Sequence, residues 1–419
     1  MAAEGGESVS RGVVVTGLGA VTPLGSGAAR FWARLCAGRS GVGPITLFDA
    51  GAFPVRIAGE VTGLTPPPEI DRKRVRRLDR YALFGVAAAL QAWRDAGVEA
   101  HDPWQAGIVL GSSHGGESTA IQAAAALGPR PSPKAASPLV IPRMLNNMAA
   151  AQAAMLLDLR GPGFALASAC ATGGHALGEA SEIIRRGDAE VMVAGAAEAC
   201  ITPLTLAGDH ALGALSRRNA EPHRACRPFD RDRDGFVLAE GAAALVLEER
   251  EHARRRGARV YAELSGYGAT TDAVHETRPD PTGAAAAWAI SRALEKSGTG
   301  PREVDAVFAH AAGTRAGDAA EARALGTSLG AALGGIPVTA VKSMTGHMFA
   351  ASGAAQAVAA VKAIEAGAVP PTINCGRIDV TEIACVPGEV LRKPLSRALS
   401  NSFGFGGHNA ALLFSAAAS

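Results

Sequence analysis

The chain of 419 residues has little that would mark a secreted, metal-binding or membrane protein. Its six cysteines form no Cys-x-x-Cys pair and no Cys/His spacing suited to zinc, which argues against a disulfide framework and a metal site. No window reaches the ~18 consecutive apolar residues of a membrane span, and the opening MAAEGGESVSRG has no apolar signal segment. We therefore expect a soluble, cytoplasmic protein without a metal.

Charge of one sign and aromatic side chains are also scarce. The formal net charge is only +2, so no overall field favours a nucleic acid or a membrane surface as a partner. Aromatic residues make up 5% of the chain, whereas alanine and glycine are abundant. Because small side chains let helices pack closely on sheets, this composition indicates a tightly layered α/β protein.

Short apolar runs alternate with longer helical stretches, which predicts strand–helix–strand units and a mainly parallel sheet. An amphipathic helix is predicted at 78–97, with Gly97 as its C-cap. Strands are predicted at 12–18, 106–112, 164–168, 190–196, 243–248, 260–273, 304–310, 336–341, 397–403 and 409–415.

Two stretches resemble each other across the chain. VVVTGLGAVTP near the start and AELSGYGATTDA after residue 255 both run from a strand into glycine, a small residue, glycine and a small residue. This similarity suggests two copies of one α/β unit, an N-terminal half at 1–255 and a C-terminal half at 256–419. No long linker separates them, so we expect the halves to pack into one body.

The first candidate for chemistry is Cys170, in FALASACATGGHALG. A strand is predicted to end before it and a helix of small residues to begin after it. A cysteine at a helix N-terminus lies near the positive end of the helix dipole, which lowers its pKa, and such a sharp turn has the geometry of a nucleophile elbow. The local pattern leaves open that Cys170 is a small buried core residue.

Three further stretches carry candidate groups. His310 ends an apolar run in VFAHAAGTRAGD, and Lys342 and His347 flank a turn in VKSMTGHMFAASGA. SNSFGFGGHN, at 400–409, has glycines that allow backbone N–H groups to point into a cavity. Taken one at a time, these residues could equally be a strand-end histidine, a surface lysine, a helix-capping histidine and a tight hairpin. Together with Cys170 they suit acyl transfer on a thioester.

These motifs, in order, resemble those of the condensing enzymes of the thiolase superfamily. The similarity is greatest to the β-ketoacyl-acyl-carrier-protein synthase II group, including the ketosynthase α subunits of type II polyketide synthases. It runs from about residue 12 to 415 and includes VVVTGLGAVTPLG, ASACATGGHALG, GDAEVMVAGAAEA, RPFDRDRDGFVLAEGAAALVLEE, HAAGTRAGDAAEA, VKSMTGHMFAASGA and NSFGFGGHN. The resemblance implies the thiolase fold, α/β with αβαβα layers and two pseudo-duplicated halves.

The resemblance also implies roles for individual residues. Cys170 would accept the acyl group, while His310 and His347 would drive decarboxylation and stabilise the enolate. The backbone N–H groups of Cys170 and Phe405 would form the oxyanion hole, and Phe405 would gate the extender. The residues expected to support these groups are Lys342 and Glu321 beside the histidines, Thr314 in the histidine motif, and Phe403 and Gly406 in the gate turn.

The implied reaction is decarboxylative Claisen condensation of a Cys-bound acyl chain with malonyl-acyl-carrier protein, giving a β-ketoacyl thioester. No cofactor or metal is expected, because the substrates ride on the phosphopantetheine of the carrier protein. The implied partners are that carrier protein and a second subunit, either a second copy or a chain-length factor. The stretch DRKRVRRLDR, at 71–80, carries six cations, and Lys73, Arg76 and Arg77 are the expected docking contacts. A basic run of this kind is otherwise a solvated helix face.

Two departures from the family pattern bear on the substrate. The histidine motif reads His310-Ala311-Ala312-Gly313-Thr314, so a hydroxyl usually present at position 312 is missing. His114 stands where the family usually has an aliphatic residue in the acyl pocket, which disfavours a saturated tail. The missing hydroxyl bears on how malonyl is positioned and on the rate, and His114 points to a type II polyketide or polyene pathway.

Three alternative functions are weighed against the predicted polyketide or polyene condensation. The chain could be a housekeeping fatty-acid elongation synthase, since chain length and unsaturation are not encoded in any motif. A non-elongating chain-length-factor type lacks the nucleophile that is present here. A biosynthetic thiolase needs a second catalytic cysteine, and neither Cys375 nor Cys385 lies in a suitable glycine-rich turn.

Overall fold

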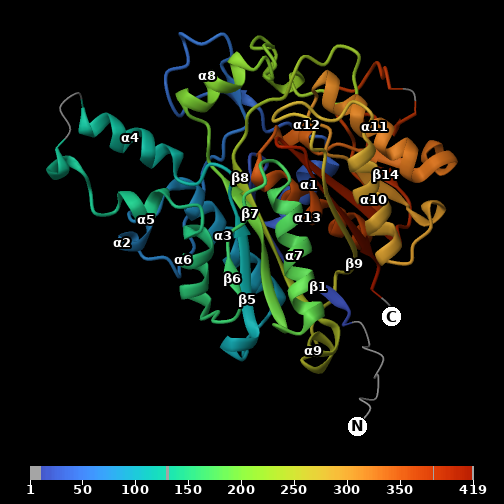
Figure 1. Ribbon diagram of the computed structural model, residues 1–419, viewed down its shortest axis with the longest axis horizontal. Helices are drawn as coiled ribbons and strands as arrows, with labels where there is room; N and C mark the ends of the chain where they lie inside the picture. The colour runs from blue at the N-terminus through green and yellow to red at the C-terminus, as the bar shows by residue number, and fades with distance from the viewer. Residues whose placement is uncertain (1–10, 129–131, 381, 418–419) are drawn as a thin grey trace.

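The computed structural model describes residues 11–128, 132–380 and 382–417. Most of the opening stretch MAAEGGESVSRG therefore lies outside the described residues. A single twelve-stranded sheet runs through the protein (Figure 1). It comprises β1 (Val13–Thr22), β2 (Gly25–Ser26), β5 (Ala106–Gly111), β6 (Gly163–Phe164), β7 (Val191–Glu198), β8 (Gly241–Glu249), β9 (Ala262–Thr271), β10 (Ala306–Phe308), β11 (Pro337–Thr339), β13 (Ala384–Cys385), β15 (Arg397–Gly404) and β16 (His408–Ser415). Two small ladders join β3 (Gly43–Pro44) to β4 (Ile57–Ala58), and β12 (Ala368–Val369) to β14 (Leu391–Arg392).

The helices lie on both faces of the sheet. They are α1 (Ala28–Cys36), α2 (Arg72–Val75), α3 (Arg80–Ala96), α4 (Glu117–Leu127), α5 (Val140–Met144), α6 (Met148–Leu157), α7 (Thr172–Arg186), α8 (Pro203–Ala211), α9 (Arg250–Arg255), α10 (Ala284–Lys296), α11 (Arg315–Leu329), α12 (Lys342–Thr345) and α13 (Ala350–Ala366). The predicted amphipathic helix is confirmed as α3, which ends on Gly97 in the left-handed conformation. Among the described residues, no helix is both long and apolar enough to cross a membrane.

The strand order shows two related halves. On one side it runs β1-β8-β7-β5-β6, and on the other β9-β16-β15-β10-β11, with matching strand directions. The halves meet where β1 pairs antiparallel with β9. The prediction of a mainly parallel sheet is therefore wrong for the centre of the sheet. There, β8 and β16 each run antiparallel to both of their neighbouring strands.

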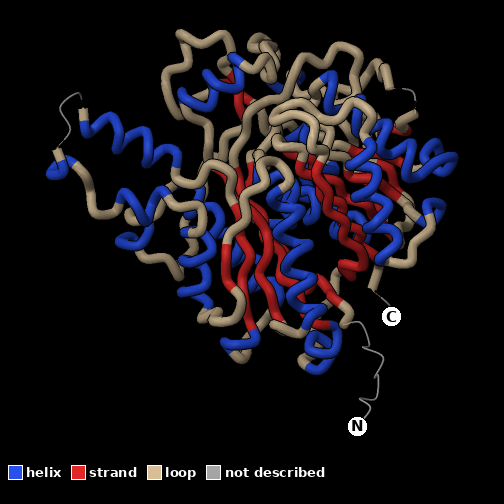
Figure 2. Tube along the Cα trace, in the orientation of Figure 1, coloured by secondary structure: helices blue, strands red, loops and turns tan. Residues whose placement is uncertain are grey.

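The layers follow from where the apolar side chains gather. Helices α3 and α6 cover the outer face of the N-terminal strands, and α10 and α11 cover the outer face of the C-terminal strands. Helices α7 and α13 pack against each other and against strands of both halves, in the largest core cluster. Figure 2 shows helices between the two groups of strands. This order confirms the αβαβα layers and paired halves predicted from the sequence.

The repeated glycines have a structural reason. A Cβ atom on Gly19 of β1 would lie 2.0 Å from the carbonyl oxygen of Ala88 in α3, and one on Gly268 of β9 would lie 2.0 Å from that of Ala289 in α10. Each half thus uses glycine to bring its first strand against its outer helix. The similarity between VVVTGLGAVTP and AELSGYGATTDA reflects the same packing in both halves.

One predicted strand is largely absent. Within the predicted strand at 164–168, only Phe164 pairs with β5. Together with the preceding Gly163 it forms the short edge strand β6. The chain then turns toward α7, and Ala169 adopts a positive φ of 49°. This turn positions the residue that follows it, Cys170.

Replacing Gly268 with alanine should destabilise the protein. The added methyl group would overlap the backbone of α10, so the free energy of unfolding should fall by about 1–3 kcal/mol. Urea unfolding followed by circular dichroism would measure this. The control is Gly326→Ala in α11, where no heavy atom lies within 4 Å of the new Cβ and stability should hold or rise. Equal stability of the two variants would contradict the packing argument.

Candidate active site

Cys170 lies at the turn between β6 and α7, two residues before the helix begins. It is 5% exposed and follows Ala169, whose backbone is in the left-handed region. A non-glycine residue held in this region stores strain and is frequent at nucleophile turns. The structure therefore places Cys170 on the predicted elbow, with its sulfur at the wall of a cavity of about 340 Å³.

The turn between β15 and β16 approaches Cys170 from the C-terminal half. A Cβ atom on Gly404 would lie 3.0 Å from the backbone nitrogen of Cys170 and 2.6 Å from the carbonyl oxygen of Ser168, so glycine is required for this approach. The next residue, Phe405, directs its backbone N–H at the Cys170 thiol. Gly406 follows with φ 84°, which turns the chain back into β16. The two halves thus bring together the N–H groups expected to form the oxyanion hole.

The charge state of the thiol differs from the sequence expectation. Burial raises the pKa of Cys170 to about 12, and the positive charge of Lys342 and the N–H of Phe405 offset only part of this rise. The prediction that the helix N-terminus lowers this pKa is therefore wrong, because desolvation outweighs the dipole in so closed a position. The thiol is protonated at neutral pH and must lose its proton when the acyl donor arrives.

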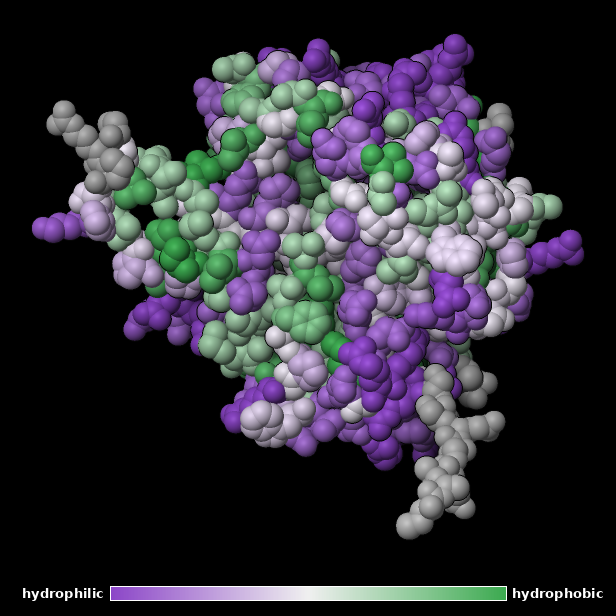
Figure 3. All heavy atoms as spheres, in the orientation of Figure 1, coloured by the Kyte–Doolittle hydropathy of each residue, from purple (hydrophilic) through white to green (hydrophobic). Residues whose placement is uncertain are grey.

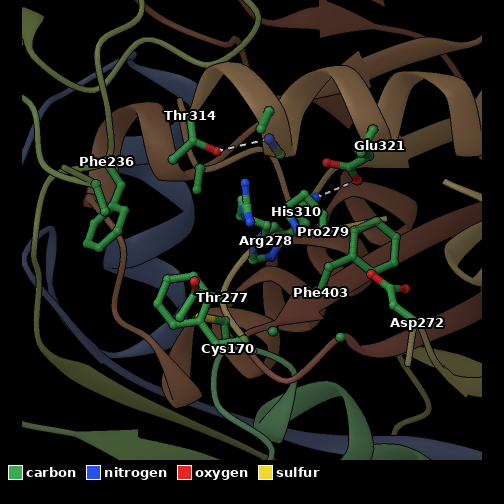
Figure 4. Close-up of a pocket in the computed structure, with 18 of the residues that line it drawn as sticks. Cys170, Phe236, Asp272, Thr277, Arg278, Pro279, His310, Thr314, Glu321 and Phe403 are labelled. Atoms are coloured by element: carbon green, nitrogen blue, oxygen red, sulfur yellow. Dashed lines mark hydrogen bonds between the residues drawn. The ribbon is translucent and has the colours of Figure 1, made fainter. Parts of the chain in front are cut away.

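His310 lies two residues after the end of β10 and faces the same cavity (Figure 4). Its backbone N–H and that of Ala311 donate to the two carboxylate oxygens of Glu321, at 2.8 and 2.6 Å. Its carbonyl oxygen accepts from the ammonium group of Lys342 at 2.5 Å. Main-chain hydrogen bonds on both sides therefore fix the position of His310, and its buried Nδ1 has no protein partner.

His347 lies between α12 and α13 and is 2% exposed. Its Nδ1 is 3.0 Å from the hydroxyl oxygen of Ser352, which also accepts from the backbone N–H of Met348 at 2.9 Å. That acceptance leaves the Ser352 proton to be donated to Nδ1. When Ser352 donates in this way, the imidazole proton of His347 is on Nε2, where it can be donated to a substrate.

The two imidazoles form a neutral pair. Their ring centroids are 5.6 Å apart. Burial holds the pKa of both histidines well below the ordinary value, and the charge of Lys342 lowers it further. Two neutral rings beside a thiol can donate hydrogen bonds to a thioester carbonyl on which negative charge develops.

Lys342 and Glu321 support the pair from behind. Lys342 is 1% exposed. Burial lowers its pKa to about 8, although the negative charge of Glu321 acts to raise it. Burial raises the pKa of Glu321, although three N–H donors favour its ionised form. Sequence reasoning missed two residues here: Asn401 donates to Glu321 at 3.2 Å, and Gln356 donates to the carbonyl of Asn401 at 2.8 Å.

Several other predicted residues line the cavity. Phe403, Phe405 and Thr314 do so, and Ala312 presents its methyl group where the expected hydroxyl is missing. The Thr314 hydroxyl accepts from the backbone N–H of Gly317 at 3.2 Å and so begins α11. The loop at 277–280 also lines the cavity, and no motif had marked it.

Other predicted residues are not among those that line the cavity. His114 is close to Glu198, with ring nitrogen and carboxylate 3.5 Å apart. Lys73, Arg76 and Arg77 are exposed on and after α2, whereas Arg80 forms an ion pair with the buried Glu240. The basic run therefore offers one cation fewer at the surface than its sequence suggests.

The two cysteines considered for a thiolase mechanism lie elsewhere. Cys375 and Cys385 are buried in the core cluster under α10 and α11 and hydrogen-bond to each other. They belong to the packing of the C-terminal half.

Family models match nearly the whole chain. The model of the β-ketoacyl synthase N-terminal domain matches residues 10–253, and that of the β-ketoacyl synthase C-terminal domain matches residues 261–376.

Individual relatives and solved structures agree with these matches. The 3-oxoacyl-[acyl-carrier-protein] synthase 2 of Synechocystis sp. is 44% identical over 96% of this chain and 97% of its own length. A ketosynthase structure, described as a type II polyketide synthase acyl-carrier protein in complex with its ketosynthase bound to the hexaketide, has a TM-score of 0.90 at 33% identity. The match covers 98% of this chain and 100% of that one. The ishigamide ketosynthase/chain length factor gives a TM-score of 0.91 at 32% identity, with coverage of 98% and 100%.

Replacing Lys342 with methionine should make Cys170 less reactive toward iodoacetamide. Removing the ammonium charge raises the pKa of the thiol, and below the pKa each unit of that rise lowers the thiolate fraction about tenfold. The alkylation rate, followed by mass spectrometry, should fall between pH 6 and 8. The difference should narrow above about pH 8, where Lys342 itself loses its proton.

The matched control is Lys362→Met. Lys362 lies at the far end of α13, where it pairs with Glu365, so its removal should leave the alkylation of Cys170 unchanged. Equal rates for wild type and Lys342→Met at pH 7 would contradict the electrostatic role of Lys342.

Proposed function

Because the chain belongs to the β-ketoacyl synthase family, we propose that it joins an acyl chain held on Cys170 to a malonyl group on acyl-carrier protein. One observation carries this proposal: a thiol, two neutral histidines and the N–H of Phe405 meet at one buried cavity. The relatives named 3-oxoacyl-[acyl-carrier-protein] synthase 2 support the same reaction class.

The reaction has two stages at this site. In the first, the Cys170 sulfur attacks the acyl thioester carbonyl, and the carrier thiol leaves with the proton that Cys170 loses. The N–H groups of Cys170 and Phe405 would stabilise the tetrahedral oxyanion, a contribution of roughly 3 kcal/mol per well-placed donor. The product of this stage is an acyl-Cys170 thioester and a free carrier thiol.

In the second stage, the malonyl thioester loses carbon dioxide and forms an enolate. His347 and His310 would donate N–H hydrogen bonds to its oxygen. As neutral donors they add no strong acid beside the carbanion. The enolate carbon then attacks the acyl-Cys170 carbonyl, so that a C–C bond forms, the C–S bond breaks and Cys170 leaves as a thiolate, which takes up a proton from solvent to restore the resting thiol. This chemistry draws on no cofactor.

Two surfaces of the molecule indicate where the proposed partners would bind. The exposed cations Lys73, Arg76 and Arg77 offer a positive face to an acidic carrier protein. A second subunit would cover the free edge of β6, beside which Phe164, Met155 and Ile141 are exposed. Figure 3 shows apolar side chains gathered over the α4–α6 side of the molecule. We assign this face to a second copy or to a chain-length factor.

The finer assignments rest on fewer observations. A type II polyketide or polyene pathway fits His114 and Ala312 better than housekeeping fatty-acid synthesis does, because both change the polarity around the substrate. All six cysteines are free thiols, which fits a cytoplasmic setting. The boundary between the N-terminal and C-terminal halves is placed at residue 255, between β8 and β9.

Two variants should separate the two stages. Cys170→Ala should abolish acyl loading from acyl-carrier protein, since no sulfur remains to form the thioester. His310→Ala should keep loading but lower condensation with malonyl-carrier protein by a factor of about 10² or more, because an enolate donor is lost. Intact-mass spectrometry follows loading and product formation. Loading on Cys170→Ala, or near wild-type condensation by His310→Ala, would refute the assigned roles.

The pathway is tested by varying the acyl chain. Wild-type enzyme with carrier-bound chains of increasing length and unsaturation should favour short or unsaturated chains. Fast elongation of long saturated chains would instead assign the protein to fatty-acid synthesis.

A further inference from the structure

A cluster of mainly acidic side chains lies beside Phe349, outside the catalytic residues. His114 is in the loop after β5, Glu117 begins α4, Glu198 ends β7 and Asp209 lies on the buried face of α8. The charges of Glu117, Glu198 and Asp209 all act on His114. Four separate elements thus converge on one polar site within a largely apolar surrounding.

This acidic cluster borders the space around Cys170. Ser113, beside His114, donates to the carbonyl oxygen of Ala169 at 3.0 Å, directly before the nucleophile. Phe349 lines the catalytic cavity, stacks on His347 with centroids 4.9 Å apart, and meets the ring of His114 edge to face at 5.2 Å. Phe349 is therefore the wall between the cavity and the cluster.

Phe349, the residue that separates the cavity from the acidic cluster, has a strained backbone. Phe349 has φ 44°, in the left-handed region that disfavours an aromatic residue. The side chain of His114 beyond it is still 30% exposed, so the cluster adjoins open space. An acyl chain that extends from Cys170 past Phe349 would reach the acidic cluster.

The cluster has an unmatched negative charge. Glu198 is fully buried and satisfied by the Ser112 hydroxyl and by the backbone N–H groups of Ser113 and His114. Among the described residues, Glu117 accepts a side-chain hydrogen bond only from the Thr205 hydroxyl, at 2.7 and 2.8 Å. Even with His114 protonated, three carboxylates face one positive charge.

Asp209 marks the place of the missing partner. It is 8% exposed, and its buried Oδ2 has no hydrogen-bond partner in the part of the chain that the structure describes. Burial raises its pKa to about 6, with the charge of His114 opposing and that of Glu117 adding to the rise. A buried polar atom without a partner is costly, and a positively charged N–H donor would remove that cost.

A metal ion fits these residues less well. Donor atoms of His114, Glu198 and Cys200 lie within 4.8 Å of one another. However, three hydrogen bonds already occupy the carboxylate of Glu198, and burial with nearby acids raises the pKa of Cys200 well above its ordinary value, against the thiolate that a metal requires. The cluster is better matched to a cation that donates hydrogen bonds.

Resting on the acyl transfer proposed above, we propose that the acidic cluster binds a protonated amine at the far end of the acyl chain carried by Cys170. Asp209 is the main acceptor, Glu117 the second, and Phe349 moves aside to admit the chain. The substrate class is then an aminoacyl thioester whose amine is separated from the carbonyl by a short chain, and the three acidic side chains set the specificity.

The test compares two acyl chains of equal size. Carrier-bound 5-aminopentanoyl ends in an ammonium group where hexanoyl ends in methyl. Initial rates of loading on Cys170, measured by intact-mass spectrometry, should be at least about tenfold higher for the amine in the wild-type protein. Asp209→Asn should remove most of this preference and leave hexanoyl loading unchanged or faster. Glu117→Gln should act in the same direction but less strongly.

The control variant is Glu295→Gln, which removes an exposed acid on α10 and should leave both rates unchanged. Hexanoyl loading by Asp209→Asn shows that this variant is folded. Faster loading of hexanoyl than of the amine by wild type would overturn the inference and leave the proposed function standing. Equal slowing of both chains by Asp209→Asn would also overturn it. Failure of every acyl donor, acetyl included, to label Cys170 would overturn the proposed function as well.

Discussion

Burial of ionisable groups in one closed space is the constraint on which the rest of the site depends. Away from water, a charged imidazole or thiolate is costly, so both histidines stay neutral and the thiol keeps its proton. Lys342 is a buried cation facing these groups, and it is stabilised by Glu321 and by the carbonyl oxygen of His310. Desolvation thus produces the two properties that condensation needs, neutral donors and a sulfur that is unreactive until its substrate is bound.

The fold makes this burial possible by bringing two halves together through small residues. Cys170 comes from the N-terminal half, whereas His310, His347 and Phe405 come from the C-terminal half. The glycines of β1 and β9 let the outer helices approach, and Gly404 lets one turn contact the backbone of the other half's nucleophile loop. A scarcity of aromatic side chains is therefore a requirement of close packing, while Phe236, Phe349, Phe403 and Phe405 are placed at the cavity.

Local sequence patterns predicted most of the strands and the nucleophile turn, because short apolar runs and small residues mark them directly. The patterns failed where the outcome depends on distant contacts. The direction of β8 and β16 depends on their neighbours in the sheet, and the pKa of Cys170 depends on desolvation by residues from the other half. Ser352 and Gln356 carried no signal, since a polar residue in an alanine-rich helix acquires its role only when the helix is placed beside His347 and Lys342.

Phe349 contacts both the proposed site for the far end of the acyl chain and a histidine of the proposed mechanism. One face of its ring stacks on His347, the enolate donor of the proposed mechanism, and its edge meets His114 in the acidic cluster. A chain that displaces Phe349 to reach the cluster must also change the packing around His347. The backbone that holds Phe349 in this position is strained. The proposed recognition of the far end of the acyl chain would thereby be coupled to the position of His347.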